Sequence, residues 1–224
     1  MTRDILAEQR DYYAARASEY DDWWFRCGRY DNGEEANARW AADVREVEEG
    51  LVEFDPRGDV LELAAGTGLW TRHLARSGRR VVAVDASAET LAVNRGRVDV
   101  GSVDYVVADL FGWEPAEQFD VCFFGFWLSH VPQARFDAFW GLVRRALRPD
   151  GRVFLVDSYA GDVAHTGEPL GGELERRRVA DGREFTIVKR RWEPDALAAR
   201  VAPLGFRLEL AKSGHGHFLY GGGA

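Results

Sequence analysis

The sequence predicts an α/β fold, with a parallel sheet covered by helices on both faces. Three observations lead to this prediction: strands that are apolar along their whole length, helices that alternate with them, and a glycine-rich turn after the first strand. Strands buried on both faces are apolar without alternation, which is typical of parallel sheets between two helical layers. Right-handed crossovers then make the sheet doubly wound, with the ligand site beyond the carboxyl ends of the strands.

The first fifty residues are predicted to be helical because they are rich in Ala, Glu and Arg. In Glu34–Gly50 the apolar residues recur at spacings of three and four, which places Trp40, Val44 and Val47 on one face. Gly50 is the predicted end of this helix.

Strands and helices then alternate along the chain. The predicted strands are Asp59–Ala64, Arg80–Asp85, Asp104–Ala108, Phe119–Phe126 and Arg152–Asp157. The predicted helices are Leu69–Ser77, Ala88–Arg97 with Ser87 as its N-cap, and Gln133–Leu147. Gly78 is predicted to end the first of these helices, and the turn Pro149-Asp150-Gly151 is predicted to follow the last.

The rest of the chain predicts a hairpin and a closing pair of strands. Gly171–Val179 and Glu184–Arg190 flank Asp181-Gly182, a strong signal for a tight turn. A short helix is predicted over Pro194–Leu204. Two strands, at Gly205–Ala211 and His217–Tyr220, are then expected to end the sheet with an antiparallel edge.

Composition limits the classes of partner. The chain has 224 residues and a formal net charge of −8, so neither a nucleic-acid backbone nor an anionic membrane is an expected partner. No signal peptide and no membrane span are predicted. The two cysteines, Cys27 and Cys122, belong to no CxxC motif, so we expect a cytoplasmic protein.

A metal site is considered at His215 and His217, which a strand would place on the same face. No Asp, Glu or Cys nearby completes a set of ligands at the usual spacing. A structural or surface role is therefore favoured, and no metal is predicted.

The most informative stretch is Val60–Trp70, in which a strand, a glycine turn and a helix follow one another. Gly66 and Gly68 allow the backbone to approach a ligand closely, and the helix that follows presents unpaired N–H groups. Asp85 ends the second strand, where a carboxylate can accept from both ribose hydroxyls. Asp109 follows the third strand and can accept from an adenine amino group. Three successive strand ends therefore predict an adenosine site.

These motifs resemble those of the class I S-adenosylmethionine-dependent methyltransferases. The turn is similar to the acidic–x–G–x–G–x–G motif of that family, with Ala64 in place of the first glycine. Asp85 and Asp109 match the acidic residues after the second and third strands. Phe119–His130 and Leu147–Val156 match later motifs in order and spacing. The closest subgroup is the small-molecule methyltransferases of bacterial secondary metabolism.

The resemblance implies a Rossmann-like, seven-stranded sheet in the order 3-2-1-4-5-7-6 with the last strand antiparallel. It implies a single domain: a helical lid over 1–50, a cofactor-binding core over 55–160, and a hairpin insertion with C-terminal strands over 161–224. The implied cofactor is S-adenosylmethionine. The residues implied to bind it are Tyr13, Tyr20, Glu62, Ala64, Gly66, Thr67, Gly68, Trp70, Thr71, Asp85, Ala86, Asp109, Leu110, Phe111, Phe124 and Phe126.

His130 is the candidate general base because it follows the fourth strand and imidazole titrates near neutrality. The alternative is that it packs against the cofactor and fixes its loop. In the family, a tyrosine of the N-terminal segment can reach the cofactor carboxylate, and Arg16 is a candidate to neutralise that group. The candidate acceptor-binding residues are Trp23, Trp24, Trp127 and Tyr159.

Six basic residues of the predicted hairpin are either a solvated face or an attraction for an anionic acceptor such as a carboxylate or phosphate. They are Arg176, Arg177, Arg178, Lys189, Arg190 and Arg191.

The expected reaction is methyl transfer to an O, N or C nucleophile of a small molecule, by a monomer or homodimer. A non-methylating reaction on the same cofactor site is the main alternative. A tRNA or protein methyltransferase is disfavoured by the acidic charge and by FGFW in the fourth-strand motif. A dehydrogenase is disfavoured because Thr71 replaces the third glycine of its fingerprint. A scaffolding protein is disfavoured because Asp85, Asp109 and the two glycines add little to folding.

Overall fold

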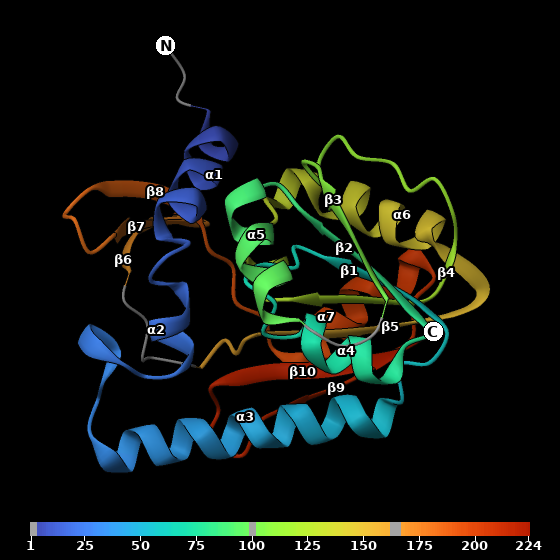
Figure 1. Cartoon of the computed structure of the whole chain (residues 1–224), viewed down its shortest axis with the longest axis horizontal. Helices are drawn as coiled ribbons and strands as arrows, with labels where there is room; N and C mark the ends of the chain where they lie inside the picture. The colour runs from blue at the N-terminus through green and yellow to red at the C-terminus, as the bar shows by residue number, and fades with distance from the viewer. Residues whose placement is uncertain (1–3, 99–101, 162–166) are drawn as a thin grey trace.

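The computed structural model describes residues 4–98, 102–161 and 167–224. Its main sheet has seven strands in the order β3-β2-β1-β4-β5-β10-β9, which confirms the predicted topology (Figure 1). β10 runs antiparallel to both of its neighbours, and β1 to β5 are parallel. The strands are β1 Asp59–Leu63, β2 Arg80–Asp85, β3 Val103–Val107, β4 Phe119–Gly125, β5 Leu147–Ser158, β9 Leu208–Lys212 and β10 Phe218–Gly223.

Helices cover both faces of this sheet. The main helices are α3 Glu34–Phe54, α4 Thr71–Ser77, α5 Ala88–Arg97, α6 Phe136–Ala146 and α7 Pro194–Val201. Along β4, Cys122 and Phe124 pack toward α6 and α7, whereas Val121 and Phe123 pack toward α3 and α4. Because neighbouring side chains of a strand point to opposite faces, the continuous apolar run serves two cores at once.

The long helix α3 departs from the prediction at its end. It continues through Gly50 and ends at Phe54, where Asp55 takes a left-handed conformation at φ 55°. A Cβ on Gly50 would lie 2.7 Å from Cε2 of Tyr220. This glycine therefore permits close packing of the helix on β10 and does not mark a helix end.

Other predicted boundaries shift by a few residues. The predicted helix Gln133–Leu147 begins as a 3-10 turn at Gln133–Arg135 before α6 starts. β5 begins at Leu147, which pairs with Phe119, and the register shifts before Val121. The observed strand β5 therefore begins five residues before the predicted strand Arg152–Asp157, and it includes Pro149-Asp150-Gly151, which were predicted to form a turn.

A second, three-stranded antiparallel sheet lies at one end of the main sheet (Figure 1). Its strands are β6 Glu168–Gly171, β7 Leu174–Arg178 and β8 Glu184–Val188, so the predicted hairpin gains one strand. Helix α1, Ile5–Arg16, packs along β8. Gln9 Oε1 accepts the amide of Val188 at 3.0 Å, and Glu8 Oε1 accepts that of Thr186 at 2.6 Å.

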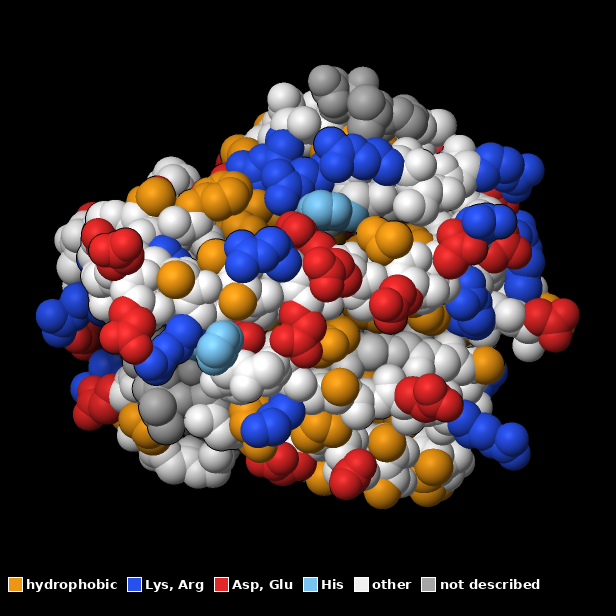
Figure 2. Space-filling model, turned by 90° about the horizontal axis from the view of Figure 1, so that it is seen from below, with side chains coloured by type: hydrophobic (Ala, Val, Ile, Leu, Met, Phe, Trp, Pro, Cys, Tyr) orange, Lys and Arg blue, Asp and Glu red, His pale blue; other side chains and the backbone are white. Residues whose placement is uncertain are grey.

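Only part of the predicted helical lid over 1–50 lies at the carboxyl ends of the parallel strands. Helix α1 and the short helix α2, Tyr20–Trp24, lie beside the small sheet, whereas α3 runs across a face of the main sheet (Figure 1). Figure 2 shows the underside of the view in Figure 1, with acidic and basic side chains interspersed and hydrophobic atoms scattered among them. In the described part of the chain, no helix combines the length and the hydropathy that a membrane span requires.

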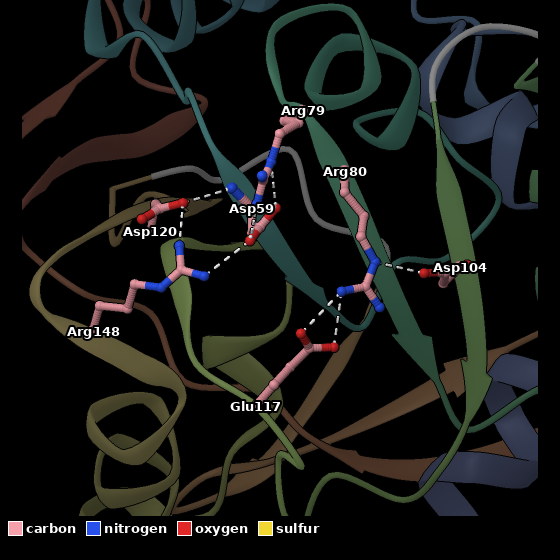
Figure 3. A network of polar contacts seen from close by, with 7 residues as sticks. All are labelled: Asp59, Arg79, Arg80, Asp104, Glu117, Asp120 and Arg148. Carbon is pink, nitrogen blue, oxygen red and sulfur yellow. Dashed lines mark hydrogen bonds and ion pairs between the residues drawn. The ribbon is translucent and has the colours of Figure 1, made fainter.

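A network of ion pairs joins β1 to its neighbours at the amino ends of the parallel strands (Figure 3). The carboxylate of Asp59 accepts from Arg79 at 2.6 Å and from Arg148 at 2.9 Å. Asp120 accepts the backbone amide of Asp59 at 2.7 Å and also pairs with Arg148. These contacts hold β1 and β4 in register far from the glycine turn.

We expect Asp59→Asn to lower the free energy of unfolding by about 1–2 kcal/mol at pH 7, because a buried carboxylate loses its hydrogen bonds to charged groups. The hydrogen bond from Arg79, followed by that from Arg148, lowers the pKa of Asp59. The contribution is therefore complete well above the ordinary aspartate value of about 3.9 and is lost as the pH falls below it. Urea denaturation at several pH values measures this difference.

Asp150→Asn is the matched control, because Asp150 is exposed. A stability difference between Asp59→Asn and wild type that stayed constant into strong acid would contradict the role of the ionised carboxylate.

Candidate active site

A cavity of about 320 Å³ lies at the carboxyl ends of the parallel strands, between them and α1. It is the pocket at which the predicted strand-end residues converge. The lining from the main domain is Ala64, Gly66, Thr67, Asp85, Ala86, Ser87, Glu89, Thr90, Asp109, Leu110, Phe111, Gly125, Phe126, Trp127 and His130. The lining from the N-terminal segment is Leu6, Gln9, Arg10, Asp11, Tyr13, Ala14, Ala17 and Tyr20.

The turn after β1 is built from left-handed residues. Ala64, Gly66 and Gly68 have φ values of 54°, 56° and 88°. A Cβ on Gly68 would lie 2.7 Å from Oδ1 of Asn94, a side chain that donates to Thr71 Oγ1 at 2.8 Å. Ala64 therefore adopts the backbone conformation that favours glycine, so its departure from the family motif affects the backbone as well as adding a methyl group.

Asp85 joins the first two strand ends. Its Oδ2 accepts the amide of Gly66 at 2.9 Å, and its Oδ1 accepts that of Ser87 at 2.9 Å. Burial raises the pKa of Asp85, and these backbone hydrogen bonds act in the opposite direction. Each carboxylate oxygen keeps a second lone pair for a hydroxyl donor in the cavity.

Asp109 is bound by a residue that sequence reasoning missed. Arg10 of α1 donates to Oδ2 of Asp109 at 2.6 Å, and Oδ1 accepts the amide of Phe111 at 3.0 Å. Both charged side chains are nearly half exposed. Nothing in the sequence marks Arg10, because its partner lies 99 positions away and α1 carries other charged residues. This contact joins α1 to the end of β3.

Glu62 lies behind the turn, outside the cavity lining. Burial raises its pKa to about 8, while a hydrogen bond from Thr71 acts to lower it. None of the described residues forms a hydrogen bond with its Oε2. A carboxyl group in this state gains from a cationic or hydrogen-bonding ligand beside the turn.

His130 is held at three points at the other end of the cavity. Its Nδ1 lies 2.7 Å from the carbonyl of Val188 and its Nε2 lies 2.6 Å from the Tyr13 hydroxyl. Its backbone carbonyl accepts from Gln9 at 3.1 Å. A carbonyl can only accept, so the proton is on Nδ1 and the Tyr13 hydroxyl donates to Nε2.

The ionisation of His130 differs from the sequence expectation. Burial is the main cause that lowers its pKa well below the ordinary value, and the positive charges of Lys189, Arg177 and Arg16 lower it further. Burial also raises the pKa of Tyr13. The pair is therefore neutral near pH 7, and the geometry favours an orienting role over that of a base with a pKa near neutrality.

Aromatic residues form the wall between the turn and His130. Phe126 has a φ of 54°, an uncommon value for a bulky residue that occurs where surrounding packing fixes the backbone. Its ring lies edge-on to Trp23, with centroids 5.1 Å apart. Tyr20 lines the cavity beside it, and its ring centroid is 5.7 Å from that of Trp23. Trp23 thus lies one layer behind the lining.

Several predicted site residues do not line the cavity. Trp24 and Trp70 belong to the buried core beneath α3, with centroids 5.6 Å apart. Phe124 packs on the opposite face of the sheet, 5.2 Å from Phe139. Tyr159 pairs with Trp192 beyond the end of β5. The sequence does not show which face of the sheet Phe124 points to, because β4 is apolar on both faces. Glu62, Gly68 and Thr71 also lie outside the lining, behind the turn.

The candidate metal histidines contact an acidic residue of α3. His217 Nδ1 lies 2.8 Å from Oδ2 of Asp43, and Asp43 Oδ1 accepts the amide of His215 at 3.0 Å. Asp43 also accepts from the hydroxyl of Ser213 at 2.6 Å. This arrangement ties the β9–β10 turn to α3. Over residues 4–98, 102–161 and 167–224, no group of three potential metal ligands occurs.

Comparison with known proteins places this geometry among methyltransferases. Residues 60–151 match the family described as "Methyltransferase domain". Proteins named as uncharacterized methyltransferases in Mycobacterium tuberculosis and Mycobacterium bovis are 34% identical over 154 residues, 58% of this chain and 55% of each relative. The chain therefore spans about half the length of these curated relatives.

Solved structures extend the likeness to the whole chain. DhpI in its complex with SAM and HEP is 37% identical, covers 99% of this chain and 98% of its own, and superposes with a TM-score of 0.80. The 1,6-didemethyltoxoflavin-N1-methyltransferase of Burkholderia thailandensis is 19% identical over 96% of this chain and 88% of its own, with a TM-score of 0.60. The second likeness shows the fold alone.

We expect Ala64→Gly to leave the free energy of unfolding unchanged or to raise it by up to about 1 kcal/mol. The left-handed conformation costs an alanine roughly 1–2 kcal/mol, which outweighs the added entropy of a glycine in the unfolded chain. Ala138→Gly, at an exposed position of α6, is the control and should cost about 0.5–1 kcal/mol. Equal losses in urea denaturation of both variants would contradict the strain at Ala64.

We expect the imidazole of His130 to stay neutral, with its proton on Nδ1, when the pH falls from 8 to the ordinary histidine value of about 6.5, because its pKa is well below that value. Two-dimensional ¹H–¹⁵N NMR of the histidine rings measures this directly, with His130→Gln to assign the signals. Free imidazole in the same tube serves as the titrating reference. A His130 signal that moved together with the reference would show that the buried geometry is wrong.

Proposed function

The chain belongs to the class I S-adenosylmethionine-dependent methyltransferases, and we propose that it methylates an O, N or C nucleophile of a small molecule, an intermediate of natural-product synthesis. S-adenosylmethionine is the cofactor of this family and supplies a methyl group activated by its positive sulfonium. The observation that carries the proposal is the lining of one cavity: strand-end carboxylates line one part of it, and Tyr13 and His130 line another.

The residues around the turn fit the cofactor. Asp85 offers lone pairs for ribose hydroxyls, and Asp109 offers an oxygen to an adenine amino group. Glu62 keeps a fully buried oxygen without a partner, which suits an ammonium group beside the turn. Gly66 and Gly68 leave the backbone bare at the same place. The ribose hydroxyls, the adenine amino group and the ammonium group of such a cofactor thus each find a complementary group.

The part of the cavity near His130 is proposed to hold the acceptor. Trp127 and Phe126 give it apolar walls, and Tyr13 gives it a hydroxyl. Because the Tyr13 hydroxyl donates to His130, its own lone pairs face away from that bond and can accept a proton donor of the acceptor. We propose that this pair orients the nucleophile and keeps water out. Positioning of that kind can contribute about 7–11 kcal/mol to a methyl transfer.

The size of the cavity, about 320 Å³, supports a small acceptor over a macromolecule. Helix α1 lies over part of the strand ends, where it is bound to Asp109 and to His130. A non-methylating reaction is separated by the mass of the product. A gain of one CH2 group indicates transfer, and an isomer of the substrate indicates the alternative.

We expect Asp85→Ala to weaken the binding of S-adenosylhomocysteine at least tenfold, or about 1.4 kcal/mol, because the ribose hydroxyls lose their acceptor. Isothermal titration calorimetry gives the dissociation constants. Asp150→Asn, which removes a carboxylate from the exposed surface, should bind as wild type does.

Asp85 also accepts two backbone amides, so a thermal melt must first show that the variant is folded. Tight and equal binding to wild type and folded Asp85→Ala would refute the placement of the nucleoside.

A further inference from the structure

A buried cluster of cations borders the His130 end of the cavity and has no role in the function proposed above. We call it the cation cluster: Arg16 at the end of α1, Arg177 on β7, and Lys189 just after β8. The side chains of Arg177 and Lys189 are 11% and 7% exposed. Lys189 follows Val188, whose carbonyl lies 2.7 Å from the His130 ring, and its Nζ binds the hydroxyl of Ser129. Arg16 lies about one helical turn after Tyr13, whose hydroxyl binds the same ring. The charges of all three cations lower the pKa of His130 in addition to burial.

Arg16 is a buried cation that has aromatic neighbours in place of an anion. Its guanidinium carbon lies 5.0 Å from the ring centre of Tyr20 and 5.8 Å from that of Trp23. Among the residues that the structure describes, no carboxylate pairs with Arg16, and its Nε has no hydrogen-bond partner. Contacts with rings contribute about 0.5–2 kcal/mol each, whereas desolvation of a charge costs several. A guanidinium in this setting is suited to bind an anion.

Lys189 faces the same region from the small sheet. Its Nζ donates to Ser129 Oγ at 2.8 Å and to Ser158 Oγ at 3.0 Å, and it lies 3.8 Å from Oδ1 of Asp157. Burial lowers the pKa of Lys189 to about 8, so the ammonium form dominates at neutral pH. Ser129 follows β4 and Ser158 is the last residue of β5, which places the ammonium beside the ends of these central strands.

The cations in and beside the cluster differ in their partners. Arg177 and Arg191 share the carboxylate of Glu175, at 2.7 and 2.6 Å, and Lys189 lies near Asp157. Within residues 4–98, 102–161 and 167–224, Arg16 pairs with no carboxylate although its side chain is buried. The exposed neighbours on β7 differ in this respect, because Arg176 pairs with Glu168 and Arg178 with Glu184.

We propose that the cation cluster binds an oxyanion carried by the acceptor, a phosphate-type or carboxylate group, with Arg16 and Lys189 as its main ligands. The proposal rests on the proposed function, because the cluster borders the part of the cavity assigned to the acceptor. Arg16 affects the pKa values of Tyr13, Tyr20 and His130. Its guanidinium carbon lies 5.0 Å from the ring centre of Tyr20, which lines the cavity. We therefore assign Arg16 to the acceptor, in place of the cofactor carboxylate that the family resemblance implies.

The test uses simple anions as probes of the cluster. Inorganic phosphate is titrated into the full-length protein saturated with S-adenosylhomocysteine, and binding is followed by ³¹P line broadening. We expect saturable binding to wild type, weakened at least tenfold in Arg16→Gln and in Lys189→Met. Acetate is then added as a competitor. Displacement of phosphate by acetate indicates a site for either oxyanion, and retention of phosphate indicates a site for the tetrahedral group.

Arg178→Gln is the matched control, since it removes one positive charge from the exposed side of the same small sheet. It should bind phosphate within twofold of wild type. Calorimetry with S-adenosylhomocysteine on every variant reports whether the fold and the cofactor site are intact. Lys189→Arg, which keeps the charge, provides a second folded variant and should retain phosphate binding.

Two outcomes would overturn the proposal. One is that wild type binds no phosphate, or that wild type and Lys189→Met bind phosphate equally, while S-adenosylhomocysteine still binds. The proposed function would survive this result. The other is Arg16→Gln that loses S-adenosylhomocysteine and keeps phosphate, which would return Arg16 to the cofactor carboxylate. Loss of S-adenosylhomocysteine binding in wild type would instead refute the proposed function itself.

Discussion

Three parts of the chain are held together by the hydrogen bonds that meet at His130. The ring binds the carbonyl of Val188 in the small sheet and the hydroxyl of Tyr13 in α1, while its backbone carbonyl accepts from Gln9. The residue itself stands on the loop after β4. Because each contact uses a different atom of one buried residue, α1 and the small sheet take a fixed place over the strand ends. The shape of the cavity depends on this junction.

The sequence was sufficient for the parts of the fold that periodicity determines. Strands such as β1 and β4 are apolar without interruption, so their burial between two layers of helices follows from general rules. The order of the strands in the sheet was predicted from the family resemblance. The glycine turn and the carboxylate of Asp85 also follow, because a strand, a turn and a helix are contiguous in the chain. Boundaries were less certain, and Gly50 shows why: a glycine can serve packing as well as termination.

The parts that sequence reasoning missed all depend on contacts between distant segments. Arg10 binds Asp109, and Lys189 binds Ser129 after β4 and Ser158 at the end of β5, but neither basic residue differs from its neighbours in any local pattern. The six basic residues of the hairpin region look alike in sequence, yet only folding shows that Arg177 is buried and Arg178 is exposed. Trp24 and Trp70 illustrate the converse, because an aromatic residue near a motif can belong to the core.

The attachment of α1 to β8 has a consequence for how this architecture can diversify. Both elements lie outside the large sheet. The side chains of Glu8 and Gln9 in α1 accept hydrogen bonds from the backbone of β8, so the two elements form one unit beside the strand ends. Substitutions in α1, which lines the cavity, or changes in β8, against which α1 packs, can therefore alter the cavity over the strand ends while Asp85 and the glycine turn stay as they are. Relatives that bind the same cofactor but different acceptors can therefore arise by changes in α1 and the small sheet.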